Sequence, residues 1–511
     1  MHISDILVVI TIFIAIVAII SERNRTYLWL KFSETEKWVC VGGVILIHIL
    51  IIFKWWMNRL PLFEKLYFPE SDWPTPNAWA YMVFLVMLVW FIYKMLYAGY
   101  PWSNREKVIK NYSELLLKGE YGLLTELIEK YHKEDIIKYL RIVRDIKIPE
   151  DTISLQRASE YRKIYDEKII LTSHKYAAMV YGRILTNEAY IEAVANINPV
   201  LFAEIIQEIN NTVENNPDFV NYYLKQLMRN KNSWFFREVR NNQNLAQYDT
   251  YDLNEERPIL FALFNDINVA LVNEAWRGVG EEAILEIKEE ANKPESPLRQ
   301  PEVEPDDYQD TIWGYRIMIA IHYFDIMVRQ AIASGCEHHM WMFYYRNFVE
   351  GILNNMDELA HPDSDINERS RNYKMLVVIF ENLMAWKKVA LQSNQNSLLY
   401  SIYSVTGDII YRVSITNKLR IEDKRYLLNW LWEDLLRTWE ENRDEITAEI
   451  IEKGFNAFST PRAMLSGPEG QTYQQVIIDM WDNRDIPVFN GMVGQRGTQF
   501  NTQVVTPFQQ P

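Results

Sequence analysis

Residues 38–53 read WVCVGGVILIHILIIF, sixteen residues without a charged side chain. Similar runs lie on both sides of it in the sequence, ILVVITIFIAIVAII at Ile6–Ile20 and AWAYMVFLVMLVWFIY at Ala78–Tyr93. A helix that crosses a bilayer needs about 17–25 mostly apolar residues, and flanking Trp, Tyr and Lys can extend a shorter run into the interface. Eight of the 17 Trp residues lie within residues 1–102. The three runs therefore predict three transmembrane helices rather than three buried core helices.

The first run differs from a secretory signal peptide, which begins with basic residues and ends at a cleavage site of small residues. Here Asp5 precedes the run, no Lys or Arg stands before it, and SER at residues 21–23 follows it. We therefore expect Ile6–Ile20 to be an uncleaved helix.

The Lys and Arg residues beside the three runs predict their orientation, because cytoplasmic flanks carry an excess of both. No Lys or Arg precedes the first run. Four lie in the loop after it, three in the loop after the second run, and four just after the third. One side of the membrane thus has eight basic residues and the other three. This distribution predicts an outside N-terminus and a cytoplasmic region 103–511, and we assume a bacterial inner membrane.

The chain has 511 residues and a formal net charge of −15. Residues 1–102 hold eight Lys and Arg against seven Asp and Glu, so the acidity belongs to residues 103–511. An acidic surface repels phosphate backbones and anionic headgroups, which argues against nucleic acid as a partner. The expected partners are the lipid bilayer and a protein. Two Cys residues exclude a disulfide framework.

The region after residue 102 has the 3.6-residue apolar spacing of amphipathic helices, and we predict an all-α fold. Ser103 and Glu106 match a capping box at the start of the first of these helices. Asn198 before Pro199 matches a helix start, whereas 398–415 is ambiguous between helix and strand. The expected parts are an anchor (1–102), a helical subdomain (103–291), an acidic Pro-rich linker (292–310), a second helical subdomain (311–458) and a flexible tail (459–511).

No fixed-period repeat is visible in the cytoplasmic region. Successive amphipathic helix pairs fit an irregular stack of pairs, and a single globular helical domain fits equally well.

Common catalytic and phosphate-binding motifs are missing from the sequence, and we expect no cofactor. Residues 322–368 hold the one group of side chains that suggests a metal, because thiolate, imidazole and carboxylate together suit zinc. Its members are His322, Cys336, Glu337, His338, His339, His361, Asp363 and Asp365. Their spacing fits no closed zinc site, and 363–374 lacks the Gly and Glu of a calcium loop. A structural role is therefore favoured, with no metal ligand and no catalytic residue assigned.

Four other features have a structural and a functional interpretation. His48 lies inside an apolar run, where it either bonds a neighbouring helix or serves a function. Gly42 and Gly43 allow close helix packing within the chain or in a homo-oligomer. The loop 55–76 is a connector at the headgroups or an outward contact loop. The last feature is a group of aromatic residues that either packs in a helix core or lines a groove for a partner helix, namely Trp430, Trp432 and Trp439.

The function class that fits these observations best is a non-enzymatic, membrane-tethered interaction or signalling protein. Since one span suffices for tethering, we also consider a stress or defence effector that acts at the membrane. Two alternatives stay open. One is an accessory subunit of a channel, transporter or envelope complex, and the other is a metal-dependent hydrolase that uses the 322–368 cluster.

Overall fold

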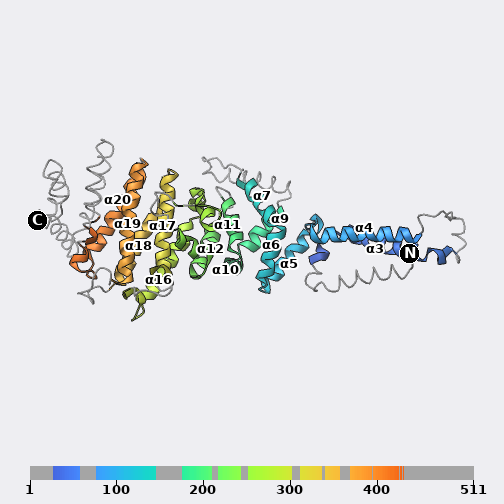
Figure 1. Cartoon of the computed structure of the whole chain (residues 1–511), viewed down its shortest axis with the longest axis horizontal. Helices are drawn as coiled ribbons and strands as arrows, with labels where there is room; N and C mark the ends of the chain where they lie inside the picture. The colour runs from blue at the N-terminus through green and yellow to red at the C-terminus, as the bar shows by residue number, and fades with distance from the viewer. Residues whose placement is uncertain are drawn as a thin grey trace, which may run out of the picture. The chain divides into compact units, whose positions relative to one another are not determined.

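The computed structural model describes residues 27–57, 76–144, 175–209, 217–242, 251, 253–301, 311–336, 340–356, 369–393, 395–424, 426–428 and 430. Within these ranges the chain forms helices and turns, and its extended pairing is an isolated bridge between Pro301 and Ser370 (Figure 1). The predicted all-α class is confirmed.

The α-helices, in chain order, are α3 (Glu34–Met57), α4 (Pro76–Leu96), α5 (Arg105–Leu117), α6 (Tyr121–Tyr131), α7 (Lys133–Arg144), α9 (Lys175–Val180), α10 (Glu188–Ile197), α11 (Pro199–Glu208), α12 (Pro217–Arg229), α13 (Trp234–Asn241), α14 (Pro258–Phe264), α15 (Ile267–Val272), α16 (Ala275–Ala291), α17 (Arg316–Ala333), α18 (Phe343–Asn354), α19 (Arg371–Gln392) and α20 (Asn396–Ile415). A π-helical turn, Tyr181–Leu185, follows α9.

The chain divides into two compact units. Unit 1 comprises Met1–Tyr139 and Gln156–Tyr190, and unit 2 comprises Leu140–Leu155 and Ile191–Pro511.

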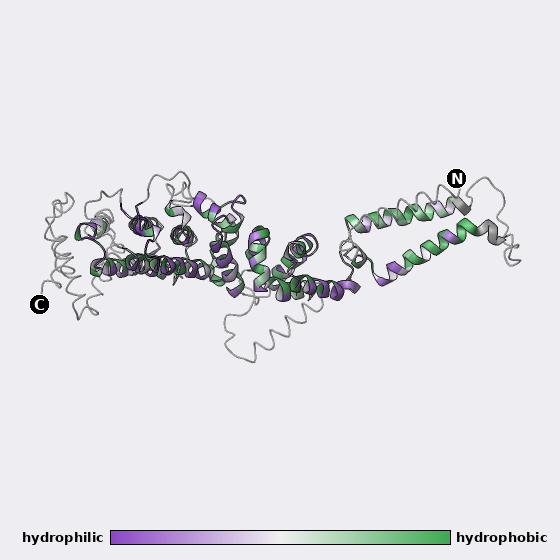
Figure 2. Cartoon of the chain, turned by 90° about the horizontal axis from the view of Figure 1, so that it is seen from below, coloured by the Kyte–Doolittle hydropathy of each residue, from purple (hydrophilic) through white to green (hydrophobic). Residues whose placement is uncertain are grey.

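In unit 1, α3 and α4 pack against each other, and we call this pair the hairpin (Figure 1). Its small core is formed by Ile47, Ala80 and Phe84. The other faces expose apolar side chains such as Val86 and Val89, which are 70% and 65% exposed (Figure 2). Surfaces of this kind suit lipid, because a soluble protein rarely leaves so large an apolar patch in water.

Two helices of the described chain are long and apolar enough to cross a membrane, over Glu34–Ile52 and Ala78–Leu96. Two of the three predicted runs therefore have the required helical form. The remaining run, Ile6–Ile20, lies outside the described residues, and so does most of the loop 55–76.

Helices α10 and α11 pass the same length and composition test only when they are joined across a 115° bend. Their apolar side chains are buried in protein, including Val194, Leu201 and Ile205. Burial in the core accounts for their apolar character, so no membrane contact is needed to explain it.

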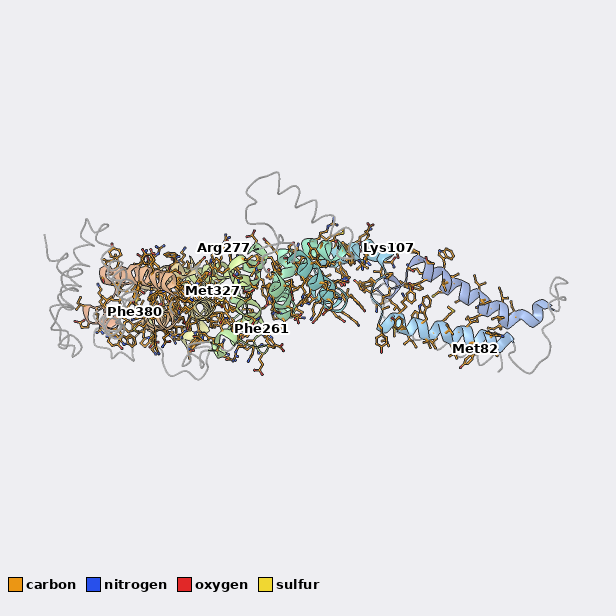
Figure 3. All side chains as sticks on the ribbon, turned by 90° about the horizontal axis from the view of Figure 1, so that it is seen from above. Met82, Lys107, Phe261, Arg277, Met327 and Phe380 are labelled. Atoms are coloured by element: carbon orange, nitrogen blue, oxygen red, sulfur yellow. The ribbon has the colours of Figure 1, made fainter. Side chains whose placement is uncertain are left out.

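Unit 2 is built by a succession of helices that pack on one another. Helix α12 packs on α16, α16 on α17 and α18, both of these on α19, and α18 and α19 on α20. Helix α17 is buried on nearly all sides, as its apolar sequence requires (Met327 in Figure 3).

Helix starts in unit 2 follow local chemistry. Asn198 accepts a hydrogen bond from the Leu201 amide and Pro199 is the first helical residue, as predicted. Residues 257–291 have apolar side chains at helical spacing, which alone predicts a single helical pattern. In the structure this stretch is divided into α14, α15 and α16, because Asp266 caps α15 and Glu274 adopts a positive φ of 48° before α16. The ambiguous segment 398–415 is helical in α20.

One cap comes from a distant helix. The Glu238 carboxylate of α13 accepts the backbone N–H groups of Ile259 and Leu260 at the start of α14, at 3.0 and 2.9 Å. Burial raises the pKa of Glu238 to about 7, although these two donors oppose the shift.

The acidic segment after α16 contributes to the core in its described part. Ser296 and Leu298 are fully buried, and Arg299 donates to the carbonyls of Ala291 and Asn355. The described part of the predicted linker is therefore packed into the core at these positions, although a linker of this composition would be expected to stay exposed. Helices α16 and α17, before and after it, pack together. Residues 302–310 lie outside the described residues, and the subdomain division stays a prediction.

Candidate functional site: the junction at the base of the hairpin

The hairpin joins the rest of unit 1 where α3 begins and α4 ends, and we call this region the junction. It comprises residues 27–37, 94–107 and 131–132. Helix α3 starts with a reciprocal capping box that the sequence interpretation missed. The Ser33 amide donates to Glu36 at 2.8 Å, and the Glu36 amide donates to the Ser33 hydroxyl at 3.2 Å. This cap fixes the angle at which the chain enters the first helix of the hairpin.

Asn104 ties α5 to the segment before α3. Its side chain is fully buried, and the Nδ2 group donates to the backbone carbonyls of Leu30 at 2.9 Å and Phe32 at 2.7 Å. Removing this amide would leave two buried carbonyls without their donors, at a cost of about 1–3 kcal/mol for each group left unpaired. Asn104 therefore fixes α5 against the base of the hairpin.

The predicted capping box of Ser103 and Glu106 is wrong. Helix α5 begins at Arg105, with Asn104 at the N-cap and no side-chain cap hydrogen bond. Because Asn104 is used for the contact with Leu30 and Phe32, its side chain points away from the helix that it precedes.

Lys31 joins the same segment to the end of α4. The residue is only 3% exposed, and its Nζ donates to the Met95 carbonyl at 2.7 Å. A cation is favoured here, because the last carbonyls of a helix carry partial negative charge. The ammonium group also lies 4.8 Å from the centre of the Tyr131 ring in α6.

Ion pairs surround these buried contacts. Glu36 pairs with Lys94 at 2.6 Å, and Glu34 pairs with Lys107 of α5 at 2.7 Å (Lys107 in Figure 3). The second pair is more than half exposed at both side chains, so water screens it and its contribution to stability is small. The buried contacts of Asn104 and Lys31 therefore dominate the stability of the junction.

Behind the junction, His132 lies among aromatic side chains. Its Nε2 shares a hydrogen bond with the Tyr112 hydroxyl at 2.9 Å, and its ring stacks on Tyr100 with centroids 5.8 Å apart. Burial, with a smaller contribution from Arg105, lowers the pKa of His132 to about 4. The imidazole is therefore neutral near pH 7, and its buried Nδ1 has no hydrogen-bond partner among the residues that the structure describes. His132 was not among the residues predicted from the sequence to have a function.

The predicted metal cluster is represented in the described chain by His322 and Cys336. His322 is buried between the rings of Tyr251 and Trp313, and burial lowers its pKa to about 4. Cys336 follows the end of α17, where Gly335 has φ 65° and the Cys336 amide donates to the Ala331 carbonyl at 2.9 Å. The surroundings of both residues therefore favour a structural role over metal binding.

The other members of the cluster lie outside the described residues, namely Glu337, His338, His339, His361, Asp363 and Asp365. Across the residues that the structure describes, no group of three or more His, Cys, Asp or Glu side chains is placed to hold a metal ion.

A buried polar cluster next to His322 was not predicted. Asp325 accepts hydrogen bonds from Arg329 Nε at 2.9 Å, from Trp386 Nε1 at 2.6 Å and from the Tyr251 hydroxyl. These donors balance the buried carboxylate, and they join α17 to α19 and to residue 251. Because the groups are inside the core, the arrangement stabilises the fold rather than presenting reactive atoms.

The hairpin glycines differ from each other. A side chain at Gly43 would collide with Met87 of α4, so Gly43 serves packing within the chain. Gly42 faces open space. His48 is exposed on α3, and its Nδ1 donates to the Val44 carbonyl at 2.9 Å.

Three Trp residues were predicted to form a helix core or a partner groove. Of these, Trp430 contacts Tyr426, and Trp432 and Trp439 lie outside the described residues.

Comparisons with protein-family models, curated proteins and solved structures find no match for this chain.

Proposed function

We propose that the chain is a membrane-tethered interaction and signalling protein, in which the helical region binds a protein partner and the hairpin localises or transmits the response. The observation that carries this proposal is the buried junction. Asn104 and Lys31 hold α5 and α4 against the segment that leads into α3. A mere anchor needs only a flexible connection, whereas these contacts couple the position of α5 to that of the apolar helices.

The membrane part in this proposal has three spans, the hairpin and Ile6–Ile20. The distribution of Lys and Arg supports an outside N-terminus and a cytoplasmic region from residue 103 onward. Exposed aromatic side chains near the helix ends, Trp38 and Tyr97, suit the membrane interface. We place the protein in a bacterial inner membrane.

The succession of contacts in unit 2 supports an irregular stack of helix pairs. Stacks of this kind bind proteins through extended surfaces. The acidity of residues 103–511 favours a protein partner over nucleic acid. It also means that the hairpin, rather than attraction to anionic lipid, keeps this region near the bilayer.

Because three spans exceed the needs of tethering, we propose the sharper form that the protein acts on the membrane as a stress or defence effector. The test compares the full chain, a chain lacking residues 1–102 and the Asn104→Ala variant in bacterial cells. Growth and membrane potential are followed at matched expression.

We expect the full chain to lower both readouts, the truncated chain to leave them unchanged, and Asn104→Ala to have a reduced effect. If the truncated chain acts as strongly as the full chain, the membrane part is dispensable and the proposal fails. If none of the three proteins changes growth or membrane potential, with or without an applied envelope stress, the proposal of an effector fails.

A further inference from the structure

His48 occupies an unusual position on α3. Its neighbour Ile47 is buried against α4, and successive residues lie about 100° apart around a helix. His48 therefore lies on a flank of the hairpin that α4 leaves uncovered, together with Val44 and Val41, which are 48% and 47% exposed. We call the side formed by these three residues the His48 face.

The imidazole uses one of its two nitrogens within the helix. A carbonyl oxygen can only accept, so Nδ1 carries the hydrogen that is donated to Val44. In the neutral ring, Nε2 is then an acceptor without a donor on the hairpin. Unpaired polar groups are costly in hydrocarbon, and ionisable residues in spans face protein or water rather than lipid. The His48 face therefore needs a covering segment that brings a donor.

A second copy of the same face fits poorly as that segment. Its His48 would present another acceptor in the same tautomer, and two acceptors form no hydrogen bond. The run Ile6–Ile20 fits better, because its single hydroxyl belongs to Thr11. Thr11 lies five residues from Ile6, at the outer end of its run, and His48 lies five residues before Phe53, at the outer end of its own. At about 1.5 Å per residue, both lie ~7.5 Å inside the apolar layer.

We infer that Ile6–Ile20 packs antiparallel on the His48 face, with the Thr11 hydroxyl donating to His48 Nε2. This inference rests on the proposed third span. In that register the numbers of facing residues add to 59, which places Ala15 against Val44 and Ala18 against Val41. Thr11, Ala15 and Ala18 are spaced i, i+4, i+7, so small side chains form one stripe and allow close approach.

The connection has a suitable length. Ile20 is followed by six residues before Tyr27, where the described chain begins at the base of the hairpin. A connection this short favours antiparallel packing of the helices that it joins.

Disulfide cross-linking in native membranes tests the register. The full chain, with Cys40 and Cys336 changed to Ser, carries Ala15→Cys and Val44→Cys, and a protease site is inserted after Asn24. After oxidation and proteolysis, the two fragments should stay joined. The matched control replaces Val44→Cys by Leu46→Cys, which is at similar depth and 44% exposed but on the opposite flank of α3. In this control we expect about fivefold less joined product than with Val44→Cys, because a disulfide needs Cα atoms within ~7 Å.

Two further variants test the hydrogen bond in the same assay. Thr11→Val should lower the yield of joined product, and Thr11→Ser should restore it. Equal joining in the two cysteine pairs, or cross-linked dimers in place of joined fragments, would overturn the inference, and dimers would identify a second copy as the covering segment.

A separate measurement distinguishes this outcome from failure of the third span. In intact cells, Ser4→Cys should react with a membrane-impermeant maleimide if Ile6–Ile20 spans the membrane. Reaction at Ser4→Cys without joining of Ala15→Cys and Val44→Cys would reject the packing and leave the span intact. If Ser4→Cys is labelled only after the membrane is permeabilised, both the third span and its packing on the His48 face are rejected.

Discussion

Asn104 makes the strongest individual contribution to the junction, because its amide supplies two buried hydrogen bonds to a segment more than 70 residues earlier in the chain. The ion pair between Glu34 and Lys107 spans a similar separation, but its exposure limits its contribution. The position of Asn104 just before a helix does not indicate that its side chain bonds a distant segment. The neighbouring Ser103 drew attention instead, since its spacing to Glu106 matches a local motif.

Asn104→Ala should lower the free energy of unfolding of the purified protein in detergent by about 2–4 kcal/mol, because two buried carbonyls lose their donors. Denaturant unfolding followed by circular dichroism measures this loss. Ser103→Ala, at the exposed neighbouring position, is the matched control and should change it by less than ~0.5 kcal/mol. Equal losses in both variants would contradict the assigned role of Asn104.

His132 gives unit 1 a dependence on pH. The unfolded chain takes up a proton near pH 6.5, whereas the folded chain keeps His132 neutral until the pH approaches its lowered pKa of about 4. Stability that is present above pH 6.5 is therefore lost as the pH falls toward 4, by up to about 3 kcal/mol. His132→Gln, whose amide can donate to or accept from the Tyr112 hydroxyl, should remove this part of the loss.

The measurement is the difference in unfolding free energy between pH 7 and pH 4.5, for the wild type and for His132→Gln. Contributions of groups common to both proteins cancel in this comparison. The same pH dependence in both proteins would show that His132 is not the group that titrates.

At the scale of elements, the 3.6-residue spacing of apolar residues was a sound guide, because each helix must bury one face. The two hairpin helices were predicted from their uncharged apolar runs, whereas the helices after residue 102, α5, α6 and α7 among them, were predicted from this spacing. The spacing did not separate α14, α15 and α16 from one another, since the breaks between these helices depend on the backbone conformation near Glu274 and on capping by Asp266. The cap of α14 by Glu238 could not be predicted, because the two meet only through tertiary packing.

The hairpin depends on close packing at Gly43. Gly43→Ile should destabilise the pair of helices by about 1–3 kcal/mol, because the new side chain overlaps Met87. Thermal unfolding in detergent measures the effect, and Gly42→Ile is the matched control, since Gly42 faces open space. A larger loss for Gly42→Ile than for Gly43→Ile would contradict the observed packing and point to a contact on the Gly42 side.

The start of α14 should depend on an acceptor at residue 238. Glu238→Ala leaves the Ile259 and Leu260 amides without their partner and should cost about 1–3 kcal/mol. Glu238→Gln keeps a carbonyl oxygen there and should cost less. Hydrogen exchange of these two amides reports the effect directly, and faster exchange in Glu238→Gln than in Glu238→Ala would contradict it.

At the scale of the whole molecule, sequence composition predicted an apolar N-terminal part and an acidic helical part, since both follow from counts of residues. The metal hypothesis shows the limit of such reasoning. Residues that are near each other in sequence, such as His322 and Cys336, differ in their surroundings once α17 forms and buries one of them. The junction was missed for the opposite reason, because Lys31, Met95 and Asn104 come together only in the folded chain.

The central claim is that the hairpin is embedded in a membrane with the helical region on its cytoplasmic side. Protease added to intact cells, and to inverted membrane vesicles from the same cells, tests it most directly when fragments are detected with an antibody against unit 2. The account predicts that residues 103–511 are spared in intact cells, degraded in inverted vesicles, and kept in the membrane fraction after alkaline carbonate extraction. Degradation in intact cells would contradict the orientation, and release by carbonate would contradict the membrane span itself.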